Sequence, residues 1–74
     1  DFFMDIYKKI DRGLSCQELG EILESARDDF PPGPALHQFM RFARELKAKN
    51  GKMIVGSERD EIIAKLKEFE QKYS

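Results

Sequence analysis

Three prolines and a glycine, PPGP, stand at the midpoint of this 74-residue chain, within the stretch DFPPGPALHQFMRFAREL. A proline ring crowds the residue before it, so Pro31 holds Phe30 out of helical geometry and predicts that the preceding helix ends near Asp29. Pro34 suits the first turn of a new helix, where its missing N–H costs nothing. The stretch therefore predicts a stiff corner between two helices, the second of which covers about residues 34–49.

Two further helices are predicted before this corner. Apolar residues recur at helical spacing over residues 2–11, and Gly13 is the expected left-handed stop after them. Ser15 and Glu18 have the spacing of a capping box, in which each side chain accepts a hydrogen bond from the other residue's backbone N–H. The second helix is therefore expected to begin at Ser15.

The fourth helix is expected to follow the segment KMIVG, with Ser57 as its N-cap. The apolar run at residues 53–55 has strand propensity but no partner strand, so it is expected to be a buried loop segment. Four short helices with brief connections predict a single all-α domain over residues 1–74, arranged as an antiparallel up-and-down four-helix bundle.

Two residues of the second helix have more than one interpretation. Gly20 costs about 1 kcal/mol relative to alanine inside a helix. Either it lets another helix approach closely, or it simply weakens its own. Cys16 is the only cysteine, which excludes an internal disulfide and favours a reducing, cytosolic setting. Its place in the first helical turn favours a lowered thiol pKa, although a structural role is the expectation.

Motifs of catalysis are missing from the sequence. There is no phosphate-binding loop, dinucleotide fingerprint or nucleophile elbow. His37 is the only histidine, so neither a metal site nor a bound cofactor is expected. No apolar run approaches the roughly 20 residues that span a bilayer. The sequence therefore predicts a protein that acts by binding rather than by catalysis.

Charge is distributed unevenly along the chain. Residues 1–34 carry four basic and eight acidic side chains, a net charge of −4, whereas residues 35–74 carry nine basic and six acidic ones, a net charge of +3. Either the two halves attract each other across the bundle, or a partner favours one of them.

The third helix carries the candidate binding face. Arg41 and Arg44 lie off its apolar stripe, and Phe42 stands beside Arg41. Arginine and aromatic side chains are typical of protein-binding patches, although a solvated face is the simpler interpretation. Nucleic-acid binding is less favoured, because Glu45 interrupts the basic face and the net charge of the chain is −1.

In its order of features the chain resembles the enterocin A immunity family, small cytosolic proteins that protect bacteriocin producers from their own pediocin-like peptides. FFMDIYKKI is similar to the first helix of the family and ELGEILESARDDF to the second. PPGPALHQFMRFARELKAKNGKMIV is similar to the family's proline step, third helix and short apolar link. ERDEIIAKLKEFEQKY is similar to the last helix, so the resemblance covers nearly the whole chain.

This resemblance implies a helical bundle and a mechanism. Family members recognise the membrane part of the mannose phosphotransferase permease from the cytosolic side, at the inner face of the membrane, once a bacteriocin has bound it. In the family the C-terminal half largely decides which bacteriocins are countered. Carried onto this chain, that half contributes the loop at 50–55 and the exposed side of the last helix. With the basic face of the third helix, the candidate partner-binding residues are Arg41, Arg44, Lys52, Met53, Ile54, Lys65, Lys67 and Lys72.

The alternative is a small helical adaptor or regulator that binds a soluble protein partner with the basic, aromatic face of the third helix.

Overall fold

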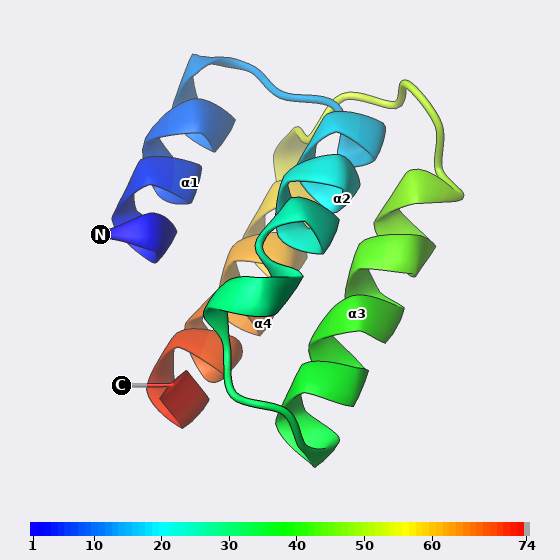
Figure 1. Cartoon of the computed structure of the whole chain (residues 1–74). Helices are drawn as coiled ribbons and strands as arrows, with labels where there is room; N and C mark the ends of the chain where they lie inside the picture. Colours follow the sequence, from blue (N-terminus) through cyan, green and yellow to red (C-terminus); the bar gives the residue numbers. More distant parts are fainter. Residues whose placement is uncertain (74) are drawn as a thin grey trace.

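Four α-helices make up most of the chain in the computed structural model, which describes residues 1–73 (Figure 1). The helices are α1 (Phe2–Arg12), α2 (Cys16–Ser25), α3 (Pro34–Lys47) and α4 (Gly56–Tyr73), with a short 3-10 turn, η1 (Arg27–Asp29), after α2. The described residues contain no strand, only one isolated bridge between Ser15 and Met53. The predicted all-α class is confirmed.

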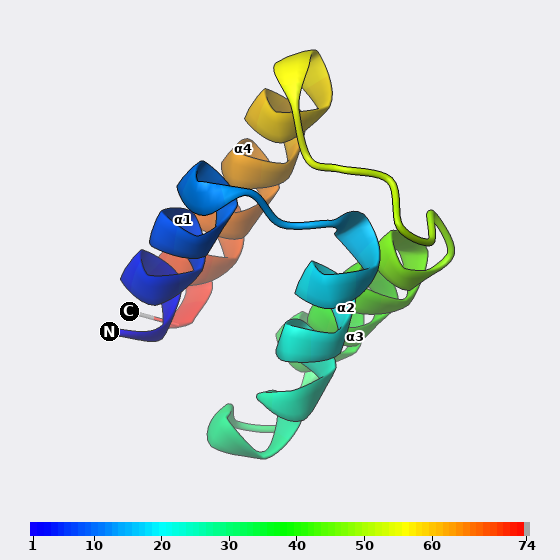
Figure 2. The ribbon, with the colours of Figure 1, turned by 90° about the horizontal axis from the view of Figure 1, so that it is seen from above.

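The helices lie as two neighbouring pairs. Seen from above, α1 runs beside α4, and α2 runs beside α3 (Figure 2). The first described residue and the end of α4 lie at the same end of the molecule (Figure 1). Both the α1–α2 and the α3–α4 connections lie at the opposite end, where they meet.

The predicted start and stop of the first helix and the predicted start of the second are confirmed. Gly13 ends α1 at a φ of 108°, and its N–H donates to the carbonyl of Ile10 at 3.1 Å. The capping box of α2 is complete, because Glu18 N–H donates to Ser15 Oγ at 3.1 Å and Ser15 N–H donates to Glu18 Oε1 at 3.0 Å. These signals are local, so the sequence alone contains them.

The predicted end of α2 near Asp29 is wrong, because the α-helix ends at Ser25 and η1 follows it. In this turn the backbone hydrogen bonds join residues three apart instead of four, as when Asp29 N–H donates to Ala26 O at 2.9 Å. Such tightening is common at the C-termini of α-helices. Pro31 acts only on its neighbour Phe30, which is extended at φ −118° and ψ 147° as predicted.

The observed end of α3 and the observed start of α4 also differ from the predicted ones. α3 ends at Lys47 rather than near residue 49, and Asn50 in the turn after it has a φ of 57°. α4 begins at Gly56, and its first helical hydrogen bond runs from Arg59 N–H to Val55 O at 3.3 Å. Ser57 therefore lies inside the first turn instead of capping it.

One hydrophobic core joins all four helices. Its largest fully buried side chains are Ile6, Leu19, Leu23, Phe39, Leu46, Leu66 and Phe69. These positions follow the helical apolar spacing of the sequence, which is why the buried faces were predictable.

Phe30 extends this core with a group of aromatic rings at one end. Its ring centroid lies 5.4 Å from that of Phe2, 5.2 Å from that of Phe39 and 4.5 Å from that of Tyr73. Aromatic pairs at 4.5–7 Å are favourable beyond the area they bury. The corner formed by the prolines thus places one ring between side chains of α1, α3 and α4.

Gly20 marks the closest approach of α2 to α3. A Cβ at this position would lie 2.6 Å from the carbonyl oxygen of Ala43 and 2.6 Å from Cγ of Lys47. Both distances are far below van der Waals contact. Of the two interpretations of Gly20, the structure supports close helix approach.

Candidate functional site

The candidate residues of α4 do not share one face. The ammonium groups of Lys65 and Lys72 lie 5.7 Å and 5.4 Å from the ring centroid of Phe69. Lys67 is exposed and follows Lys65 by two residues, which is about 200° around a helix. Lys65 and Lys72 therefore flank the same ring, whereas Lys67 lies on another side of the helix.

Arg41 and Lys65 line the same depression between α3 and α4, which we call the α3–α4 groove. Its lining residues are Gln38, Arg41, Phe42, Glu45 and Lys65.

Phe42 gives this groove an apolar surface. The side chain is half-buried, and its ring centroid lies 5.9 Å from that of Phe69. Arg41 and Glu45 form an ion pair with 3.7 Å between Nε and Oε2, and Lys72 Nζ donates to Gln38 Oε1 at 2.9 Å. The Arg41 side chain remains 75% exposed, so this surface pair stabilises the fold little and leaves the guanidinium accessible.

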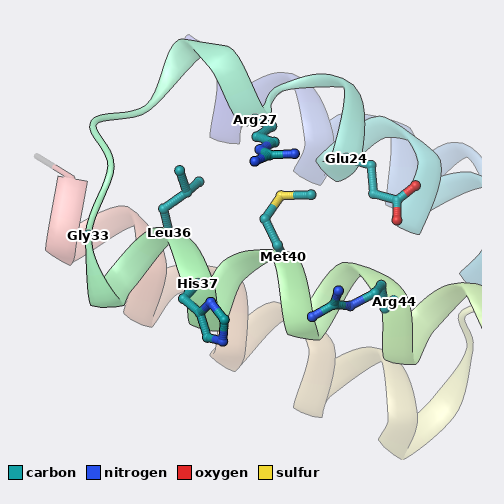
Figure 3. Close-up of a pocket in the computed structure, with 7 residues that line it drawn as sticks. All are labelled: Glu24, Arg27, Gly33, Leu36, His37, Met40 and Arg44. Carbon is teal, nitrogen blue, oxygen red and sulfur yellow. The ribbon is translucent and has the colours of Figure 1, made fainter.

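Arg44 lines a different groove from Arg41. It borders a second groove, between α2 with η1 and α3, together with Arg27 and Met40 (Figure 3). Arg41 and Arg44 are three residues apart, so they are neighbours on the exposed surface of α3, but they border different grooves.

The loop at residues 50–55 docks onto the start of α2. Cys16 N–H donates to Lys52 O at 2.8 Å, Gln17 N–H donates to Asn50 O at 3.0 Å, and Ile54 N–H donates to Leu14 O at 3.0 Å. The first N–H groups of a helix have no partner within it. The loop carbonyls satisfy two of these groups, so the backbone of the loop is fixed.

Side chains of this loop alternate between surface and core. Met53 and Val55 are 47% and 64% exposed, whereas Ile54 is 2% exposed and belongs to the core. The expected buried loop segment is therefore correct only for Ile54. Of the candidate residues in this loop, Lys52 and Met53 lie on the surface, and Ile54 does not.

A cluster of charges covers the docked loop. Glu58 accepts a hydrogen bond from Lys49 Nζ at 2.7 Å and forms an ion pair with Lys52 Nζ at 3.5 Å. The hydrogen bond from Lys49 is the main reason why the pKa of Glu58 is lowered, and it raises the pKa of Lys49. Lys52 is thus part of an ion-pair cluster rather than an isolated cation.

Cys16 lies beneath this cluster and is fully buried. Burial raises the pKa of its thiol, and the charge of Glu58 adds to the effect against the opposing charges of Lys49 and Lys52. The expected lowering of the thiol pKa is therefore wrong, because desolvation outweighs the effect of the helix N-terminus. Cys16 is a core side chain.

Several contacts that define these surfaces were not predicted. Glu24 pairs with Lys47 at 2.8 Å, and the Tyr7 hydroxyl donates to Glu70 at 2.9 Å. Each pair joins residues far apart in the sequence, and no local pattern indicates either of them.

Within residues 1–73, His, Cys, Asp and Glu side chains nowhere gather in a group of three or more that would hold a metal ion. No helix in the same described part of the chain combines the length and the apolar character needed to cross a bilayer. No protein-family model, curated protein or solved structure matches the chain.

Proposed function

We propose that this chain is a bacteriocin immunity protein of the enterocin A type, which acts by binding and not by catalysis. In this proposal it is cytoplasmic and recognises the mannose phosphotransferase permease from the inner face of the membrane, after a pediocin-like peptide has bound it. Its four helices form an antiparallel up-and-down bundle that presents the C-terminal half to the permease.

The observation that carries the proposal is the α3–α4 groove. It lies within residues 35–74, the half in which the resemblance places recognition. Arg41 and Lys65 border it, and Phe42 gives it an apolar surface. Arginine and aromatic side chains dominate binding hot spots in protein interfaces. Lys72 is exposed near the same surface, and cations at the cytoplasmic leaflet are attracted to anionic head groups.

A small adaptor that binds a soluble protein partner is the alternative, and the same groove would serve it. Glu45 lines the groove beside the cations, which disfavours a phosphate backbone as the ligand. Dependence on the permease separates the two candidates. The immunity protein associates with the permease only when bacteriocin is present, whereas an adaptor binds its partner regardless of bacteriocin.

The test is survival. The chain is expressed in the cytosol of a bacteriocin-sensitive strain, which is challenged with a panel of pediocin-like peptides. Protection against one or a few peptides, together with bacteriocin-dependent capture of the permease, is the expected result. The matched control is the same strain with an empty vector. Soluble, folded protein that protects against no peptide would contradict the proposal and favour the adaptor.

A further inference from the structure

The groove between α2 with η1 and α3 has a volume of about 510 Å³ (Figure 3). We call it the α2–α3 groove. Met40 and Leu36 of α3 point into it from one wall, and Arg27 descends from η1 on the other. It lies on the opposite side of α3 from the α3–α4 groove, because Met40 and Phe42 are two residues apart on one helix.

The floor of this groove is apolar. Leu36 and Met40 are half-buried and pack against the hydrophobic core, so part of each side chain remains exposed in the groove. Methionine is an adaptable contact for apolar side chains of different shapes. The floor therefore suits one or two aliphatic groups of a ligand.

Positive charge is in excess at the rim of the groove. Glu24 is the acidic side chain that lines the groove, and its carboxylate is already engaged by Lys47 Nζ at 2.8 Å. Arg27 and Arg44 are exposed, and neither guanidinium has an ion pair or a hydrogen bond with the side chains of residues 1–73. Two unpaired cations thus stand over an apolar floor.

We propose that the α2–α3 groove binds an acidic amphipathic peptide segment of a partner protein. The apolar side chains of the segment would rest on Leu36 and Met40, and its carboxylates would pair with Arg27 and Arg44. Guanidinium groups favour carboxylates because the two planar groups form paired hydrogen bonds. Single-stranded nucleic acid fits less well, because it is normally held by several aromatic side chains on which successive bases stack. No Phe, Tyr or Trp lines this groove, and its one ring is the imidazole of His37.

This inference goes beyond the immunity role and does not depend on it. The α3–α4 groove carries that proposal, and the α2–α3 groove is a separate surface with other residues. A chain that protects no cell would still bind the acidic segment here.

The probe is a short capped peptide of Glu and Leu in an amphipathic helical pattern, and its matched control has Gln in place of every Glu. Both are titrated into the isotope-labelled chain and followed by amide chemical shifts. The acidic peptide is expected to shift the signals of Arg27, Leu36, Met40 and Arg44. The Gln peptide is expected to bind at least about tenfold more weakly, because a hydrogen bond to a charged group is worth more than a neutral one.

Variants of the chain then test which cations bind the carboxylates of the peptide. The pair Arg27→Gln and Arg44→Gln is expected to weaken the acidic peptide by about tenfold or more. The pair Lys8→Gln and Lys9→Gln removes two exposed cations of α1, outside both grooves, and is expected to leave the affinity within about twofold.

Several results would overturn the proposal. Shifts confined to other surfaces of the wild-type chain would do so without any variant. Equal affinity for the acidic and the Gln peptide, or unchanged binding by a folded Arg27→Gln and Arg44→Gln variant, would remove the role of the two cations. Binding of an oligothymidylate at these residues, with no binding of the peptide, would assign the groove to nucleic acid instead.

Discussion

The rings of Phe30 and Tyr73 lie with their centroids 4.5 Å apart and their planes inclined by 30°. One residue belongs to the proline corner and the other to the last turn of α4, so this contact joins the middle of the chain to its end. Pro31 keeps Phe30 extended, which directs the ring to this position. The corner therefore both turns the chain and places an aromatic side chain in the core.

Replacing Phe30 with alanine is expected to destabilise the protein by about 2 kcal/mol. This is below the cost for a fully buried phenylalanine because the ring is half-buried. The melting temperature should fall by roughly 10 °C in a domain of this size. Thermal unfolding followed by circular dichroism measures it. Met4→Ala is the control, because Met4 is 49% exposed on α1 and its loss should cost little. Equal effects of the two changes would show that the aromatic contacts contribute nothing.

Replacing Pro32 and Pro34 with glycine is expected to lower the melting temperature while leaving helix content at low temperature unchanged. Both prolines are exposed, so few contacts are lost. The effect arises in the unfolded chain, which gains conformational freedom worth roughly 1 kcal/mol per site. Circular dichroism at low temperature and through the thermal transition measures both quantities. An unchanged melting temperature would disprove the stiff-corner account.

Gly20→Ala is expected to destabilise the protein by about 1–3 kcal/mol, although alanine favours helix by about 1 kcal/mol. The added Cβ would meet the backbone carbonyl of Ala43 at 2.6 Å, and backbone cannot move aside as a flexible side chain can. Chemical denaturation measures the change. Gly51→Ala is the matched control, since a Cβ there meets nothing within 4 Å. A Gly20→Ala protein as stable as the wild type would show that α2 and α3 can separate without cost.

Tyr7→Phe is expected to alter the dependence of stability on alkaline pH. Burial, followed by the hydrogen bond to Glu70 and the charge of that carboxylate, raises the pKa of Tyr7 from 10.0 to about 12. Folding therefore favours the neutral phenol. This contribution is fully present below pH 10, the unfolded value, and is lost as pH rises through about 12.

At neutral pH the variant should lose about 1 kcal/mol with the hydrogen bond. The advantage of the wild type over the variant in unfolding free energy should fall as pH rises from 10 to 12 and change sign within that interval, because a raised pKa costs the wild type about 1.4 kcal/mol per pH unit there. Denaturant unfolding at a series of pH values measures it. Titration of Tyr73, whose pKa is also raised by burial, is common to both proteins and cancels in the difference. A difference that stays constant over this interval would argue against the Tyr7–Glu70 contact.

Local features of the structure were predictable from the sequence, and features that depend on distant contacts were not. The Ser15–Glu18 capping box and the extended Phe30 follow from neighbours within a few residues. The pKa of Cys16 depends instead on its burial beneath a loop more than 30 residues away. The exposed side of the last helix was expected to carry Lys65 and Lys67 together, whereas a spacing of two residues places them about 200° apart around α4. The role of Arg27 could not be predicted from the sequence, because this residue borders the α2–α3 groove only once α2 and α3 pack together.

Reversing the charge of Lys65 and Lys67 together is expected to impair protection against bacteriocin while leaving the fold intact. The structure places the two lysines on different surfaces of α4, so their expected effects differ. Lys65 borders the α3–α4 groove and lies over the ring of Phe69, whereas Lys67 lies on another side of α4. Lys65→Glu alone should therefore impair protection, whereas the Lys67→Glu variant should protect as the wild type does. Survival of the sensitive strain measures both, with circular dichroism confirming that each variant is folded. Loss of protection with Lys67→Glu but not with Lys65→Glu would move recognition to the opposite side of α4.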